Sequence, residues 1–149
     1  MSGPGEGTVL VVDDDRMVRS FIRHALARGG LEIEEAFDGR AALQRLGAGG
    51  RIDAVLLDGL LPDMHGVALA RRLIDRPGGD RLPICFLTGA VRGKLAAAAG
   101  IGCLPKPARP SELVGEVRAL IAWAAGGGSP ADERHAVLSQ LEQGFLVGP

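Results

Sequence analysis

The chain has 149 residues, and its charges nearly cancel, with 17 lysines and arginines against 18 aspartates and glutamates. This length suits one domain with a short appendage, and the charge balance argues against wholesale binding to nucleic acid or to an anionic membrane. Aromatic residues make up 3% of the chain and tyrosine is absent. That scarcity disfavours the sheet proteins that stack single-stranded bases on aromatic rings.

The cysteines and the N-terminal residues indicate the cellular compartment of the protein. Cys85 and Cys103 stand in separate apolar runs and form no CxxC pair, which favours reduced thiols in the cytoplasm. The N-terminal residues lack the basic segment and the long apolar core of a secretory signal. No apolar run reaches the roughly 18 residues of a spanning helix. The sequence therefore predicts a cytoplasmic protein without a membrane segment.

Short apolar runs alternate along the chain with segments of helical periodicity. Strands are expected at 8–12, 31–36, 54–57, 84–87 and 101–104. Helices are expected at 17–26, 39–46, 67–74, 94–99 and 110–125, of which the fourth is short. This alternation predicts an α/β fold with a doubly wound, five-stranded parallel sheet and helices on both faces. The half-polar pattern of 31–36 indicates a strand near one edge of the sheet.

The same pattern suggests how the chain is divided. We expect a disordered N-terminus over 1–7, one domain over 8–125, a glycine-rich linker over 126–130 and a helical tail over 131–149. The tail helix carries an apolar stripe made of Val137, Leu138, Leu141 and Phe145. This stripe is expected to pack on the domain itself or on a second copy of the chain, which leaves a homodimer open.

Polar residues follow the expected strands at the points where the apolar runs end. They are Asp13, Asp14 and Asp15 after the first strand, Asp58 after the third, Thr88 after the fourth and Lys106 after the fifth. The carboxyl ends of parallel strands meet at one edge of the sheet, so these side chains should converge there. Clustered carboxylates repel one another, and they are expected to be partly protonated or to hold a hard divalent cation such as Mg²⁺. Asp15 is expected instead to cap the first helix.

Four ordered stretches give the chain a specific resemblance. They are VLVVDDD at 9–15, AVLLDGLLPDMHG at 54–66, CFLTGA at 85–90 and CLPKP at 103–107. In this order and at these strand ends, they resemble the receiver domain of two-component response regulators, which has a flavodoxin-like fold. The resemblance extends from residue 8 to about residue 125 and so covers most of the chain.

The resemblance implies a role for each residue of the cluster. Asp58 would accept the phosphoryl group, and Asp13 and Asp14 would hold Mg²⁺ or Mn²⁺ together with Asp58 and the backbone carbonyl of Leu60. Thr88 would be the switch hydroxyl and Lys106 would contact the phosphoryl group. The family also has a cis peptide bond between the residues equivalent to Lys106 and Pro107.

The resemblance further implies partners and a class of function. The phosphoryl donor would be a histidine of a sensor kinase or of a histidine phosphotransfer protein, and the output partner is not indicated. Direct contact with nucleic acid or membrane is not expected. The chain would be a signalling module that catalyses only its own phosphorylation and dephosphorylation. Autodephosphorylation should be slow, because the side chains of Leu60 and Ala90 cannot orient a water molecule.

The sequence departs from the family pattern in the part that transmits the signal. Cys103 stands where the family usually has an aromatic switch residue, and the interval from Thr88 to Lys106 is about one helical turn short. His65 stands where an aspartate is commoner. We therefore expect the signal to pass through residues 88–93 or through the tail, and only weakly through the usual face formed by the fourth helix, fifth strand and fifth helix.

Two other functions compete with this interpretation. A phosphohydrolase of the haloacid-dehalogenase type also uses an aspartate after the first strand, but Met17 stands where threonine or valine is expected and the chain has no length for a cap domain. A receiver-like interaction domain that is never phosphorylated is the second alternative. The complete set of three aspartates, one threonine and one lysine argues against it.

Overall fold

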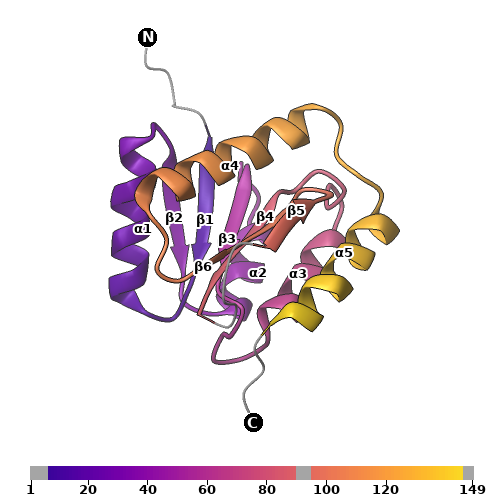
Figure 1. The fold of residues 1–149 in the computed structure, drawn as a ribbon, viewed down its shortest axis with the longest axis horizontal. Coiled ribbons are helices and arrows are strands. Elements are labelled where there is room, and N and C mark those ends of the chain that lie inside the picture. The colour runs from indigo at the N-terminus through magenta and orange to yellow at the C-terminus, as the bar shows by residue number, and fades with distance from the viewer. Residues whose placement is uncertain (1–6, 90–94, 146–149) are drawn as a thin grey trace.

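The computed structural model describes residues 7–89 and 95–145 (Figure 1). The strands are β1 (Thr8–Val12), β2 (Glu32–Ala36), β3 (Ala54–Leu57), β4 (Ile84–Thr88), β5 (Leu95–Ala98) and β6 (Ile101–Pro105). The helices are α1 (Arg16–Arg28), α2 (Gly39–Gly47), α3 (Gly66–Ile74), α4 (Pro110–Ala125) and α5 (Ala131–Gly144). Within the described ranges, no helix combines the length and the hydropathy needed to cross a membrane. The disorder expected for residues 1–7 falls outside these ranges, apart from Gly7.

Five parallel strands form the centre of the molecule in the order β2-β1-β3-β4-β6. This arrangement confirms the predicted doubly wound sheet, and the position of β2 at one edge confirms the expectation from its half-polar pattern. The chain leaves β1 toward β2 on one side and returns to β3 on the other side, so the strand order reverses at β1. Such a reversal opens a crevice beyond the carboxyl ends of β1 and β3, where ligands bind in open α/β sheets.

Two layers of helices bury the two faces of the sheet (Figure 1). Successive strand residues point to opposite faces, so Leu10 and Val12 belong to one core while Val9 and Val11 belong to the other. Helices α2, α3 and α5 cover the first core, and α1 and α4 cover the second. The strands β1, β3 and β4 are therefore apolar along nearly their whole length.

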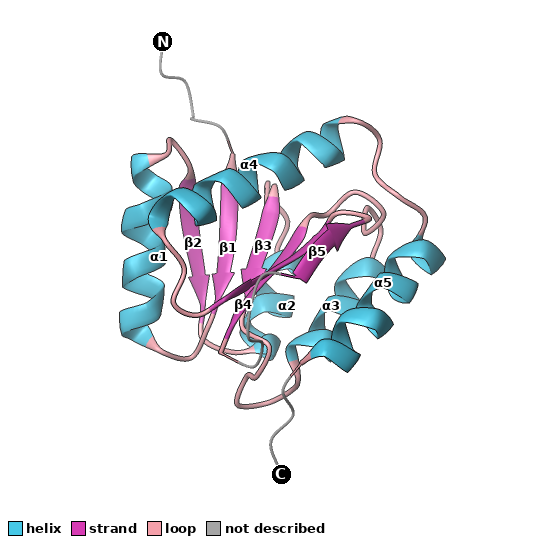
Figure 2. Ribbon diagram, viewed as in Figure 1, coloured by secondary structure: helices cyan, strands magenta, loops and turns pink. Residues whose placement is uncertain are grey.

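The expected short helix at 94–99 is wrong. Lys94 lies outside the described residues, and Leu95–Ala98 form strand β5 at the edge of the sheet (Figure 2). This strand runs antiparallel to β6, and the two are joined by a tight turn at Ala99 and Gly100, where φ is 52° and 71°. The helix propensity of alanine is a weak preference, and pairing with a neighbouring strand can override it. Here the edge of β6 supplies that pairing.

Helix α5 occupies the side of the sheet next to α3 (Figure 1), and it confirms the predicted C-terminal helix. Leu138 and Leu141 are buried in the core that α5 shares with α3, and burial of each contributes about 2 kcal/mol. The ring of Phe145 packs edge-on against Phe86 of β4, with 5.4 Å between the centroids. The apolar stripe was expected to pack on the domain or on a second copy, and in the structure it packs on the domain of its own chain.

Arg134 anchors the first half of α5. Its side chain is fully buried, and its guanidinium donates hydrogen bonds to the carbonyl oxygens of Gly79, Leu82, Ala99 and Gly100. It also lies 4.7 Å from the ring centre of Trp123. Burial lowers the pKa of Arg134 to about 10, so the group remains charged at neutral pH. These bonds join the helix to the β5–β6 turn and to the loop before β4.

Candidate functional site

The predicted carboxylates converge at the carboxyl ends of β1 and β3. These strands pair in parallel, with Val12 opposite Leu57, so the residues that follow them emerge side by side. The Asp58 amide donates to the Val12 carbonyl at 3.0 Å, which fixes the backbone of Asp58 at this edge. One carboxylate oxygen from each of Asp13, Asp14 and Asp58 lies within 4.8 Å of the others. Asp13 is buried, Asp58 is half-buried and Asp14 is exposed.

Lys106 joins this cluster from the end of β6. Its Nζ donates to Asp13 Oδ2 at 2.7 Å and to Asp58 Oδ2 at 3.2 Å, so one ammonium bridges two carboxylates. Burial alone would lower the pKa of Lys106, but the hydrogen bond to Asp13 and the charges of both aspartates outweigh it and raise that pKa above its ordinary value. The Lys106–Pro107 peptide bond is cis, as the resemblance implies.

Thr88 lies next to the residue that follows Asp58. It ends β4 and is buried, and its carbonyl accepts from the Lys106 amide at 3.0 Å. A Cβ atom built on Gly59 would lie 3.1 Å from Thr88 Oγ1, so the hydroxyl is in contact range of the backbone beside Asp58. Ala90, which was expected to flank the site, lies outside the described residues.

The loop after β3 carries Leu60, the predicted source of a backbone ligand. Its amide donates to Asp58 Oδ1 at 3.4 Å, and its side chain is exposed. Leu60 and His65 form an antiparallel bridge. The hydrogen bonds that close it run from Leu61 N to Met64 O and from Gly66 N to Gly59 O. Because the bridge uses the groups on either side of Leu60, the Leu60 carbonyl is left out of it.

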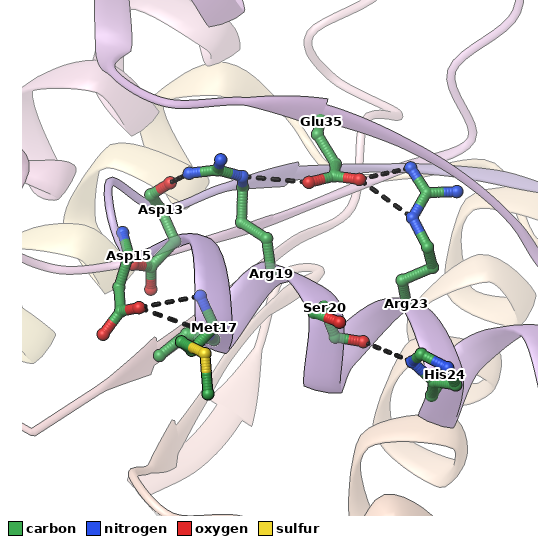
Figure 3. Close-up of polar contacts among 9 residues, drawn as sticks. Asp13, Asp15, Met17, Arg19, Ser20, Arg23, His24 and Glu35 are labelled. Atoms are coloured by element: carbon green, nitrogen blue, oxygen red, sulfur yellow. Dashed lines mark hydrogen bonds and ion pairs between the residues drawn. The ribbon is translucent and has the colours of Figure 1, made fainter.

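A group of charged residues on α1 and β2 supports the end of β1 (Figure 3). The Asp15 carboxylate accepts from the amides of Met17 and Val18, which confirms its predicted role as the cap of α1. Arg19 donates to the Asp13 carbonyl at 2.7 Å and to Glu35 at 2.9 Å. The role of Arg19 was not predicted from the sequence. A signal existed, because Arg19 and Arg23 are four residues apart and so share a helix face, and Arg23 also pairs with Glu35.

Cys103, at the position of the expected switch aromatic, points into the core instead of the site. It is fully buried among the residues under α2, α3 and α5. Burial, together with the charge of Glu116, raises the pKa of the Cys103 thiol to about 12. Neither cysteine forms a disulfide. At neutral pH, Cys103 is therefore a small protonated core residue.

An aromatic ring does reach the backbone next to Asp58, but it comes from the tail. A Cβ built on Gly59 would lie 3.1 Å from Phe145 Cε2, the same distance as from Thr88 Oγ1. The apolar periodicity of the tail predicted that Phe145 would be buried. It carried no signal of where on the domain that ring would pack.

The donor set fits a hard divalent cation. All three clustered acidic groups offer carboxylate oxygens, the ligands that Mg²⁺ and Mn²⁺ prefer. Three carboxylates also carry more negative charge than the one ammonium of Lys106 neutralises. The site therefore has both the ligand chemistry and the charge that a divalent cation requires.

Comparison with known proteins identifies the family. The family model for the response regulator receiver domain matches residues 9–118. A response regulator named MprA from Mycolicibacterium vanbaalenii is 43% identical over 117 residues, which are 76% of this chain and 49% of that protein. The corresponding protein of Mycobacterium ulcerans is 41% identical over the same length. This chain spans about half the length of these curated relatives.

Solved structures agree with the sequence comparison. The chemotaxis response regulator CheY4 of Vibrio cholerae superimposes with a TM-score of 0.65 at 30% identity, covering 76% of this chain and 98% of that one. The receiver domain of the Francisella response regulator 1452 gives a TM-score of 0.64 at 25% identity, covering 78% and 98%. With its parallel sheet, its acidic crevice and these matches, the chain belongs to the response regulator receiver domain family of two-component signalling.

Proposed function

We propose that the chain accepts a phosphoryl group on Asp58 and relays that state to a partner protein. The observation that carries the proposal is the cluster at the sheet edge, where three carboxylates lie within 4.8 Å of one another and Lys106 bridges Asp13 and Asp58. Receiver domains of this family are signalling modules, and membership in it favours this function over the phosphohydrolase alternative.

Asp58 acts as the nucleophile. Its carboxylate oxygen forms a bond to phosphorus while the P–N bond to the donor imidazole breaks, and the electron pair leaves with the imidazole nitrogen, which takes up a proton. Lys106, already within 3.2 Å of Asp58 Oδ2, is close enough to donate to a phosphoryl oxygen. The part-buried contact with Asp13 holds the ammonium in that position before the reaction begins.

Asp13, Asp14 and Asp58, together with the Leu60 carbonyl, would hold Mg²⁺ or Mn²⁺. When bound, the ion supplies neutralisation of the charge on the phosphoryl oxygens. The Thr88 hydroxyl lies beside Gly59, the residue after the acceptor. It can turn to donate a hydrogen bond to the product, an acyl phosphate that brings additional negative charge. Such a contact shifts an equilibrium between two arrangements of the surrounding surface.

An apolar hollow beside Lys106 is suited to bind a helix of the phosphoryl donor. Its volume is about 380 Å³, and its lining includes Met17, Phe21, Pro107 and Ala108. Met17 and Phe21 of α1 are among the large apolar side chains that the structure leaves exposed. In the cytoplasm, where we expect this chain, the histidine-bearing helix of a sensor kinase or of a histidine phosphotransfer protein could cover this hollow and present its imidazole to Asp58.

Incubation with acetyl phosphate tests the proposal. With Mg²⁺, intact-mass spectrometry is expected to show a gain of one phosphoryl group, and with EDTA the gain should disappear, because the carboxylate cluster would then repel the incoming phosphate. A chain that gains no phosphoryl mass contradicts the proposal and favours the non-phosphorylated interaction domain. Continuous release of phosphate from p-nitrophenyl phosphate also contradicts it and favours a phosphohydrolase.

A further inference from the structure

Helix α5 and the residue that follows it lie outside the segment shared with the family, which ends at residue 118. The helix lies beside α3, and its last turn is at the same edge of the sheet as the carboxyl ends of β1 and β3 (Figure 1). Phe145 follows directly as the C-cap residue. The tail thus brings a residue of its own to the edge of the sheet where the phosphoacceptor lies.

Two side chains converge on the backbone next to Asp58. Phe145 Cε2 and Thr88 Oγ1 each lie 3.1 Å from the place where a Cβ atom of Gly59 would be. Contacts at that distance are tight, so Gly59 has room for no side chain unless one of these two groups gives way. The same ring packs edge-on against Phe86, two residues before Thr88 in β4. Phe145 therefore contacts both of the segments that flank the acceptor, β4 and the loop after β3.

The rest of α5 is held firmly by other contacts. Arg134 fastens its first half to backbone carbonyls, and Leu138 is buried in the core. On the α3 side, His135 pairs with Asp75. The last turn is held separately, by Leu141 in the core and by the partly exposed ion pair of Glu142 with Arg71. Movement at Gly59 or Thr88 therefore reaches α5 at its last turn, while the first three turns stay fixed.

We propose that Phe145 is a positioning residue of the phosphoacceptor site and that the last turn of α5 is the element that reports phosphorylation of Asp58. The inference rests on the proposed function. With Asp58 unmodified, the ring and the Thr88 hydroxyl fill the space beside Gly59 together. When the hydroxyl turns to the phosphoryl group, this shared packing beside Gly59 is broken, so the seated ring favours the unmodified arrangement.

The coupling must act in both directions. If phosphorylation weakens the contact of Phe145, removal of the ring must make the phosphorylated arrangement easier to reach. Beryllofluoride with Mg²⁺ is a suitable probe, because it mimics the phosphoryl group on aspartate without turning over. Its affinity can be measured at equilibrium, and its effect on the tail can be followed by amide hydrogen exchange.

The experiment compares the wild-type chain with Phe145→Ala and Phe145→Leu. We expect Phe145→Ala to bind beryllofluoride and Mg²⁺ at least fivefold more tightly, the lower end of typical coupling between sites, and Phe145→Leu to restore most of the wild-type affinity. Phe37→Ala is the matched control, since it removes an exposed ring beside β2, and it should leave the affinity unchanged. In the wild-type chain, the probe should speed amide exchange at residues 139–145 but not at 131–137.

The outcomes separate this inference from the function on which it rests. An equal or weaker affinity in Phe145→Ala overturns the inference, and so does unchanged exchange at 139–145 in a wild-type chain that binds the probe. The exchange measurement needs no variant, so it holds even if Phe145→Ala folds poorly. A wild-type chain that does not bind beryllofluoride contradicts the proposed function itself.

Discussion

Asp58→Asn is expected to abolish phosphorylation of the chain by acetyl phosphate and Mg²⁺. The amide has nearly the shape of the carboxylate but is a poor nucleophile, and it removes one of the three anionic groups of the cluster. Lys106 keeps its 2.7 Å contact with Asp13, so the fold should be retained. Intact-mass spectrometry measures the effect directly, and circular dichroism checks that the variant is folded.

Asp63→Asn is the matched control for this prediction. Asp63 lies in the loop that follows Asp58, is exposed, and accepts from the amides of Gly39 and Arg40 at 2.9 Å. The asparagine amide keeps one acceptor oxygen and loses one of these two bonds, which should cost about 1 kcal/mol of stability, but phosphorylation should stay intact. The acceptor assignment would be wrong if Asp58→Asn gained one phosphoryl mass at the wild-type rate.

Lys106→Met is expected to slow phosphorylation by a factor of about 10² to 10³, the usual effect of removing one charged donor from a transition state. The Lys106 ammonium lies within hydrogen-bond distance of both Asp13 and Asp58. Methionine keeps most of the apolar stem but leaves these carboxylates without that counter-charge. Arg72→Met, which removes a positive charge from the exposed side of α3, should leave the rate unchanged. A rate within twofold of wild type for Lys106→Met would contradict the role of this lysine.

The same substitution should change stability in a pH-dependent manner. In EDTA, Lys106→Met is expected to lower the free energy of unfolding by about 2 kcal/mol, as expected for the loss of hydrogen bonds to charged groups. Because the pKa of Lys106 is raised in the folded chain above its ordinary value of 10.5, this stabilisation is complete below pH 10.5. It is lost as the pH rises through the folded-state pKa. Urea unfolding at several pH values measures the difference, which should shrink as the pH rises through the folded-state pKa of Lys106.

The parts of the fold that could be predicted from sequence are those set by local periodicity. The buried runs at β1 and β3 end at aspartates, and a parallel sheet must bring such strand ends together, so the convergence of Asp13 and Asp58 followed from pattern and topology. The cap formed by Asp15 also depends only on neighbours in sequence, since it accepts from the amide two residues later. Predictions of this kind need no knowledge of distant contacts.

The parts that could not be predicted depend on contacts between distant segments. The alanine-rich segment at β5 has the composition of a helix, yet it pairs with β6 through a turn at Ala99 and Gly100. From its neighbours in sequence, Arg134 would be expected on the surface of a polar helix. Its burial could not be predicted, because its acceptors lie 34 to 55 residues away in the sequence. The position of Phe145 beside Gly59 and Phe86 follows from where α5 packs, which no local pattern determines.

Chemical trapping of the phosphorylated residue tests the central claim most directly. The wild-type chain is treated with acetyl phosphate and Mg²⁺ and then with sodium borohydride, which reduces an acyl phosphate to an alcohol and so converts the modified aspartate into homoserine. Peptide mass spectrometry then locates the product. We predict homoserine at position 58 and at no other position. Homoserine at position 13 or 14, or a phosphoryl group on Thr88 that survives borohydride, would contradict the assignment of Asp58 as the phosphoacceptor.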